Sequence, residues 1–137
     1  MTIMGRGQAR SSWSPSDAFV DAVICATAGR VADCCSNPNC RMLTSGPHND
    51  RRKSLTLGLA IPIAAAAAAG RRYDRSLPDL EYGAPDNAIW LCRNCATLID
   101  NDVVLYSASV LRTWKRAAEE RAAATSADAG ARGTQSS

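Results

Sequence analysis

NAIWLCRNCATLID, residues 87–100, places Cys92 and Cys95 directly after a short apolar run. The apolar run predicts a buried strand, and the two residues between the cysteines predict a tight turn that aims both thiols at one point. Upstream, Cys35 and Cys40 enclose the turn-forming residues SNPN. Two such pairs make up the tetrahedral four-thiolate set that is typical of structural zinc. We therefore expect these four cysteines to bind one zinc ion.

The chain has two further cysteines, and one of them could replace a member of this ligand set. Cys34 could replace Cys35 as a ligand, because the two are adjacent. Cys25 falls near the apolar side of a predicted helix, where we expect it to pack in the core. A redox C-x-x-C motif and unmetallated core thiols are the alternatives, and the absence of a β–α–β pattern disfavours the redox one. A site closed by four thiolates stabilises the fold and does no chemistry.

The composition indicates one small domain that needs such a stabilising site. The chain has 137 residues, and its hydrophobic fraction of 46% is largely alanine, with one Phe, three Trp and three Tyr. Chains with so few large apolar side chains usually depend on a metal, disulfides or a partner. We expect a folded domain over residues 16–123, between a flexible tail at 1–15 and a disordered tail at 124–137.

No stretch predicts secretion or membrane insertion. The first ten residues have no continuous apolar segment, and residues 55–69 are too few and too rich in alanine to span a bilayer. We therefore expect a cytoplasmic protein, in which reducing conditions favour metal binding over disulfides. A net charge of +3 permits an anionic partner without requiring one.

The pattern of the remaining chain predicts an α+β fold. Residues 16–32 have the apolar spacing of a first helix, and residues 107–123 that of a C-terminal amphipathic helix. Residues 54–63 predict a strand or hairpin arm in which Pro62 marks an edge or an end. The six alanines at 64–69 fit a short helix or a loop equally well.

Four segments together resemble a bacterial branch of the HNH endonucleases. They are CSNPNCRMLTSGP, GLAIPIAAAAAAGRRYD, NAIWLCRNCATLID and VLRTWKRAAEE, and the resemblance covers about residues 30–121. It implies a treble-clef-like ββα-metal core, two strands and a helix clamped by the four-cysteine zinc. It also implies hydrolysis of DNA phosphodiesters with a divalent cation, Mg²⁺ or Mn²⁺. We expect DNA as the partner, and neither a membrane nor an organic cofactor.

The resemblance assigns roles at single positions and fails at one of them. Asn87 matches the asparagine that opens the second strand and holds the catalytic geometry. Pro62 stands where the family has the histidine that acts as general base, and proline has no titratable group. Other branches carry metal ligands at the places of Ile61, Ala96 and Asp100, of which Asp100 could bind a hard cation through oxygen. The resemblance therefore implies a nuclease that is impaired at Pro62.

Two basic clusters flank the strand that ends at Pro62. One is Arg51, Arg52 and Lys53, and the other is Arg71, Arg72 and Arg75. Phosphate contacts supply most of the non-specific affinity for nucleic acid, so the resemblance favours these arginines as DNA contacts over a merely solvated loop. His48, the one histidine of the chain, would have to reach the place of Pro62 to act as the base. The alternative function is a non-catalytic zinc module that binds nucleic acid or a protein.

Overall fold

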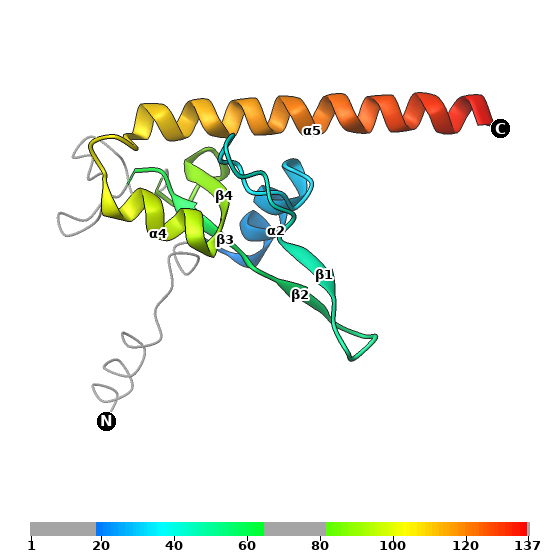
Figure 1. Ribbon diagram of the computed structural model, residues 1–137, viewed down its shortest axis with the longest axis horizontal. Helices are drawn as coiled ribbons and strands as arrows, with labels where there is room; N and C mark the ends of the chain where they lie inside the picture. The colour runs from blue at the N-terminus through cyan, green and yellow to red at the C-terminus, as the bar shows by residue number, and fades with distance from the viewer. Residues whose placement is uncertain (1–18, 65–81, 137) are drawn as a thin grey trace.

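The computed structural model describes residues 19–64 and 82–136 (Figure 1). Within them the chain is a small α+β protein, as the sequence predicts, and its strands form two separate two-stranded antiparallel sheets. The expected tail at 1–15, the alanines from residue 65 and Arg71, Arg72 and Arg75 lie outside the described residues. The elements are, in order, α2 (Asp21–Arg30), β1 (Ser45–Pro47), β2 (Ser54–Thr56), β3 (Gly58–Pro62), the 3₁₀-helix η2 (Pro85–Asn87), β4 (Ala88–Cys92), α4 (Arg93–Asn101) and α5 (Ala108–Ser136).

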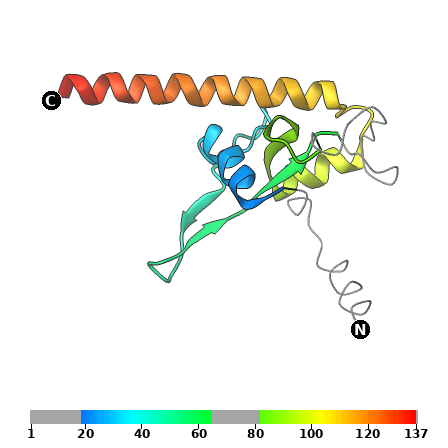
Figure 2. The same cartoon turned by 180° about the vertical axis from the view of Figure 1, so that it is seen from behind.

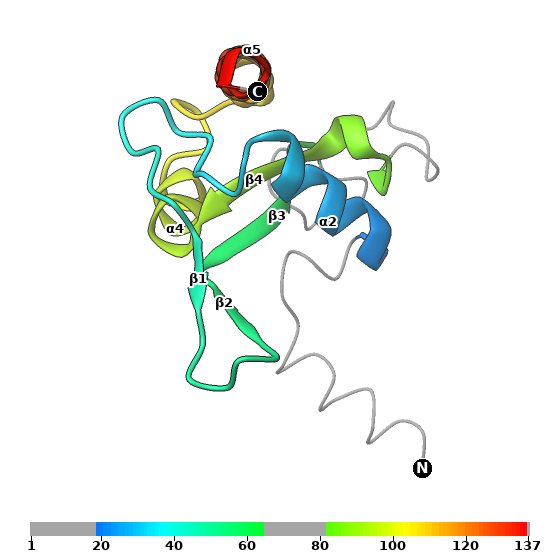
Figure 3. The same ribbon diagram turned by 90° about the vertical axis from the view of Figure 1, so that its right-hand side faces the viewer.

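The antiparallel pair of β3 and β4 forms the centre of the fold. Gly58 faces Cys92 at one end of the pair, and Pro62 faces Ala88 at the other. Side chains alternate between the two faces of such a pair, and Figure 3 shows α4 against one face and α2 against the other. All five residues of β4 are buried. Burial on both faces explains why this strand has a continuous apolar sequence.

Each face has its own core. The core on the α4 face contains Ile61, Ile63, Ile89, Leu91, Cys95, Ala96, Ile99 and Leu111. The core on the α2 face contains Phe19, Val31, Ala60, Ala88, Trp90 and Ala118. The first is built from branched aliphatic side chains, whereas the second surrounds one large ring, that of Trp90, with small residues.

Trp90 connects the strand pair to the segment between α2 and β1. Its Nε1 donates a hydrogen bond of 2.9 Å to Oγ1 of Thr44, and Thr44 Oγ1 donates to the backbone oxygen of Asp33 at 2.5 Å. The ring lies over Gly58, where an added Cβ would be 2.2 Å from a ring carbon. Glycine at this position is therefore required by the close approach of the indole.

A charged cluster attaches α5 to the rest of the fold. Lys115 donates from Nζ to the backbone oxygen of Ala88 at 2.7 Å and pairs with Glu119 at 3.1 Å. Glu119 also accepts two hydrogen bonds from Arg30 of α2, at 2.9 and 3.0 Å. These bonds lower the pKa of the Glu119 carboxyl. One carboxylate thus joins α2 to α5, and one ammonium joins α5 to β4.

The β1–β2 hairpin projects from the body (Figure 1). All three residues of β2 are exposed, and so are Arg51, Arg52 and Lys53 in the turn. An isolated two-stranded hairpin is marginally stable in water. Here its base is attached to the body by two backbone hydrogen bonds. The Leu57 N–H donates to the oxygen of Thr44, and the Arg93 N–H donates to the oxygen of Leu57.

The structure corrects several expectations. The helix α5 continues to Ser136, through the segment predicted as a disordered tail, and passes beyond the body of the molecule (Figure 2). The alanine-rich sequence of residues 122–131 has a high helix propensity, which the polar composition obscures. The single segment predicted at 54–63 divides into β2 and β3, and Cys25 is exposed rather than packed in the core.

In the described parts of the chain, no helix combines the length and the apolar character that a membrane crossing requires.

Candidate metal centre

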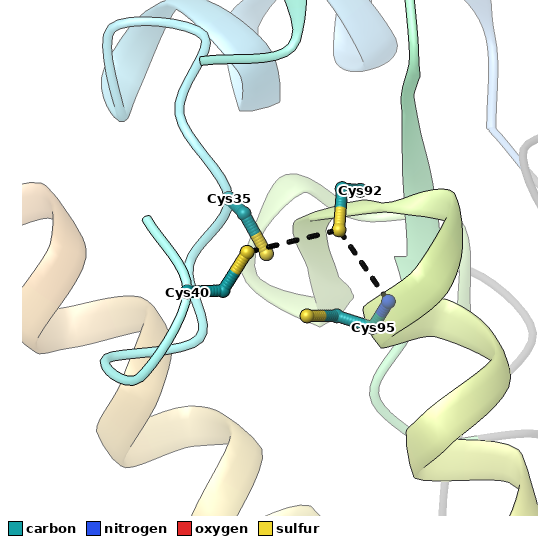
Figure 4. Close-up of side chains that lie close together, drawn as sticks. All are labelled: Cys35, Cys40, Cys92 and Cys95. Atoms are coloured by element: carbon teal, nitrogen blue, oxygen red, sulfur yellow. Dashed lines mark hydrogen bonds between the residues drawn. The ribbon is translucent and has the colours of Figure 1, made fainter. Parts of the chain in front are cut away.

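Two turns from distant parts of the sequence bring four thiols together. The Sγ atoms of Cys35, Cys40, Cys92 and Cys95 all lie within 4.8 Å of one another. Figure 4 shows Cys35 and Cys40 on one turn and Cys92 and Cys95 on the other, with their sulfur atoms facing a common centre. These are the four cysteines that the sequence predicts as ligands, and they are positioned to hold a metal ion.

Asn37 shapes the first turn. Its side-chain oxygen accepts the Asn39 N–H at 2.9 Å, and its backbone oxygen accepts the N–H groups of Cys40 at 2.9 Å and Arg41 at 3.1 Å. Arg41 then adopts a left-handed conformation with φ of 57°. Turn formation by Asn and reversal by the left-handed residue bring Cys40 back towards Cys35.

The second turn starts where β4 ends. Cys92 is the N-cap of α4, and its Sγ accepts the backbone N–H of Cys95 at 3.4 Å. The amide of Asn37 donates to Cys95 Sγ, also at 3.4 Å. N–H donors to sulfur favour the thiolate form that binds a metal. Ser36 donates its backbone N–H to the Trp90 oxygen at 2.9 Å, which attaches the first turn to β4.

Burial opposes the accumulation of negative charge at this centre. It raises the pKa of the Cys35 thiol to about 11 and also raises the pKa of Cys95. At Cys92 burial acts in the same direction, but hydrogen bonds from the Cys95 backbone and from the neighbouring thiols outweigh it and lower the pKa. Four thiolates at this spacing therefore require a compensating cation.

The donor set fits zinc. Four thiolates bound to zinc at about 2.3 Å place their sulfur atoms about 3.8 Å apart. The sulfur atoms of Cys40 and Cys92 are 3.9 Å apart, and since all four lie within 4.8 Å of one another, the set needs at most a small contraction. Cys34, the alternative first ligand, lies outside the cluster and directs its thiol to the backbone oxygen of Ala32 at 3.6 Å.

Asn87 lies at the opposite end of the strand pair. Its side chain forms hydrogen bonds with Ala64, which follows β3, and with Tyr82, which precedes β4. Its side-chain oxygen accepts the Ala64 N–H at 2.9 Å, and its amide donates to the oxygens of Ala64 at 2.8 Å and Tyr82 at 2.9 Å. Asn87 is buried. The residue thus fixes the separation between the end of β3 and the start of β4.

Pro62 occupies a strand position that tolerates proline. Ile63 donates its N–H to the Asn87 oxygen at 2.8 Å, so Ile63 and Asn87 form a hydrogen-bonded pair of the antiparallel ladder. Since such pairs alternate, the Pro62–Ala88 pair is a non-hydrogen-bonded one, in which the backbone N–H would point away from β4. The missing donor of Pro62 therefore breaks no bond between the strands.

Among the described residues, the four cysteines are the one group of three or more His, Cys, Asp or Glu side chains that could hold a metal ion. Ile61 and Ala96, two positions that the resemblance compares with ligands, both belong to the core on the α4 face. Asp100 is half-buried at the end of α4 and belongs to no group of three potential ligands in the described chain. His48 lies in the turn of the projecting hairpin, where its Nδ1 accepts the Asp50 N–H at 2.9 Å.

Some residues that support the centre carry no recognisable signal in the sequence. Asn37 was visible only as part of the turn SNPN, and its bond to Cys95 joins residues 58 positions apart. The bond from Lys115 to Ala88 likewise depends on the packing of α5. A polar residue inside a cysteine knuckle is the one local clue that could have singled out Asn37.

No protein-family model matches the chain, and no curated protein matches it either.

Proposed function

We propose that the chain is a zinc-stabilised domain of the HNH endonuclease type that acts on DNA, in which Pro62 has abolished or weakened hydrolysis. The observation that supports this proposal most directly is the arrangement around Asn87. An antiparallel strand pair is followed at once by a helix, and Asn87 binds both ends of the segment between the strands. This is the arrangement that the resemblance implies for the two strands, the helix and the positioning asparagine.

Each retained part has a definite task in this proposal. The four cysteines and their zinc hold the Cys92 end of the strand pair, and Asn87 holds the end at which a phosphodiester would bind. Pro62, next to Asn87 in the fold, cannot take a proton from water. Loss of a general base typically costs about 10²- to 10⁴-fold in rate.

A plasmid-cleavage experiment with three proteins tests the proposal. The protein, its Pro62→His variant and its Pro62→Ala variant are compared in Mg²⁺ and in Mn²⁺, after the zinc content of each has been measured. We expect cleavage by Pro62→His alone, because only this change supplies a base. The Pro62→Ala variant controls for removal of the proline ring.

Two outcomes would contradict the proposal. Equal cleavage by the protein and by Pro62→His would show that residue 62 is not the site of the base. Cleavage by none of the three would show that the fold does not carry nuclease chemistry even when a histidine is present, and would favour the second candidate.

The second candidate is a non-catalytic zinc module that binds nucleic acid. It is favoured by the packing of Ile61 and Ala96, which fill positions where a catalytic ion would need ligands. Its test is the affinity for a DNA duplex as a function of salt, since phosphate contacts make the affinity fall steeply as salt rises. Absence of binding at low ionic strength would exclude this candidate.

A further inference from the structure

A cavity beside the first cysteine turn brings together two arginines from distant parts of the chain. It has a volume of about 190 Å³ and lies between the end of α2, the segment of residues 32–41 and α5. Val31, Ala118 and Ala122 form apolar walls, and Arg41 and Arg121 contribute the charged groups. Cys34, the thiol excluded from the metal centre, also lines this cavity.

Besides two arginines, the cavity is lined by Cys35 of the metal centre, whose thiolate would offset part of their positive charge. No aspartate or glutamate is among its lining residues, and neither Arg41 nor Arg121 has an ion pair with the described residues. By contrast, Arg30 is paired with Glu119 at 2.9 Å. A single exposed arginine without a partner is common on protein surfaces. Two that line the same hollow from positions 41 and 121 concentrate positive potential at one point.

The size of the cavity indicates what it can hold. Pockets for whole drug-sized ligands have volumes of roughly 300 to 1,000 Å³, so a cavity of about 190 Å³ takes one chemical group rather than a large molecule. Guanidinium groups match the oxygen atoms of a phosphate with paired N–H donors. Val31 and Ala118 are buried, so they give the cavity an apolar wall.

We propose that the cavity between α2 and α5 is a binding site for a phosphate group, held by Arg41 and Arg121. The group comes from a free mononucleotide or from the backbone of a nucleic acid strand. The site lies beside the cysteine centre and not at Pro62, and its existence does not depend on nuclease activity. Hydrolysis and phosphate binding can therefore be tested separately.

Cys34 makes the cavity measurable in the zinc-bound full chain. Iodoacetate and iodoacetamide alkylate the same thiolate with loss of iodide, but only iodoacetate is an anion. At one cysteine, the rate with iodoacetate is divided by the rate with iodoacetamide. The intrinsic reactivity of the thiol affects both rates equally, so this ratio reports the local electrostatic potential. Cys25 is exposed on α2 and provides the reference in the same molecule. Mass spectrometry quantifies the alkylation of each cysteine.

We expect the ratio of iodoacetate to iodoacetamide rates to be at least about threefold higher at Cys34 than at Cys25 at low salt, because two neighbouring cations attract an anion by this order. Arg41→Gln and Arg121→Gln should each lower the ratio at Cys34. Glutamine has a Cβ, as arginine does, so the substitution leaves the steric demand of the left-handed backbone at position 41 unchanged. Arg112→Gln removes the same charge from an exposed position of α5 and should leave the ratio unchanged.

Protection experiments then identify the source of the phosphate. Inorganic phosphate, adenosine monophosphate and a single-stranded oligonucleotide are compared for their ability to slow alkylation of Cys34 by iodoacetamide. Protection by the oligonucleotide at much lower phosphate concentration supports a strand backbone, and equal protection by the mononucleotide supports a small ligand. Equal rate ratios at Cys34 and Cys25, or no protection of Cys34 by any of the three, would overturn the proposal.

Discussion

The two ends of the β3–β4 pair differ in how completely their sites are built. At the Gly58–Cys92 end, four thiols converge within 4.8 Å and receive N–H donors from Asn37 and Cys95. At the Pro62–Ala88 end, the side chain of Asn87 makes three hydrogen bonds, but no titratable group stands at position 62. One end has candidate ligands and polar support, whereas the other has polar support without a titratable side chain at position 62. The hydrogen-bonded support of the strand pair therefore does not depend on a reacting group at that position.

The largest effect is expected from the metal end. Cys92→Ser should unfold the domain or lower its melting temperature drastically, because it removes one of the four metal ligands while serine can still cap α4. Calorimetry and zinc analysis measure both consequences. The matched control is Cys25→Ser, which changes an exposed thiol outside the cluster. Similar melting temperatures for the two variants would show that the four-cysteine centre does not stabilise the fold.

The next largest effect tests the opposite end. Asn87→Ala leaves the N–H and oxygen of Ala64 and the oxygen of Tyr82 without their partner. We expect a loss of about 2 to 4 kcal/mol in the free energy of unfolding, since unsatisfied buried polar groups are costly. Urea denaturation measures the loss. A change below about 0.5 kcal/mol would show that these bonds contribute little to stability.

The third prediction concerns Gly58, which lies at the metal end of the strand pair but is not a ligand. Gly58→Ala places a Cβ 2.2 Å from the Trp90 ring, so the ring must move and its bond to Thr44 must lengthen. We expect a loss of about 1 to 3 kcal/mol. Gly46→Ala is the control, because its Cβ would have no neighbour within 4 Å. Equal stabilities of the two variants in urea would contradict the close packing of Trp90.

The smallest effect concerns the charged cluster that attaches α5 near Ala88. The pKa of Glu119 is lowered, mainly by its hydrogen bond from Arg30. A carboxyl with a lowered pKa in the folded state contributes stability above its unfolded pKa, near 4.5, and loses it as the pH falls through the folded value. Glu119→Gln should cost about 1 kcal/mol at neutral pH, and the difference should vanish in acid.

Urea denaturation of both proteins from pH 7 down to the lowest pH at which zinc remains bound measures this dependence. A cost that stays unchanged over this range would show that Glu119 acts through packing and not through its charge. The Glu120→Gln variant is the control, since Glu120 is the exposed neighbour of Glu119 on α5.

The sequence predicts the metal end better than the support around it. Cysteine spacing is a local property, so the four thiols that converge could be named in advance. The bonds from Asn37 to Cys95 and from Lys115 to Ala88 cross 58 and 27 positions, and no local pattern reveals them. The hairpin of β1 and β2 was missed for a related reason, because its strands have three residues each and little periodicity.

The opposite end shows the same limit. The resemblance to HNH endonucleases assigns a positioning role to Asn87, but only the structure identifies Ala64 and Tyr82 as its partners. The helix α5 is longer than the apolar periodicity predicts, because the helix propensity of alanine extends it through a polar segment without that periodicity. The exposure of Cys25 was mispredicted, because a thiol fits either side of a helix.

The ladder position of Pro62 has a consequence for how such a domain is selected. Proline at a non-hydrogen-bonded pair removes no bond between β3 and β4, so screens for expression, solubility or thermal stability would not register the residue there. On the proposed function, only an assay of DNA cleavage would distinguish proline from histidine at position 62. Chains with either residue would then be expected to reach the same amount of folded protein.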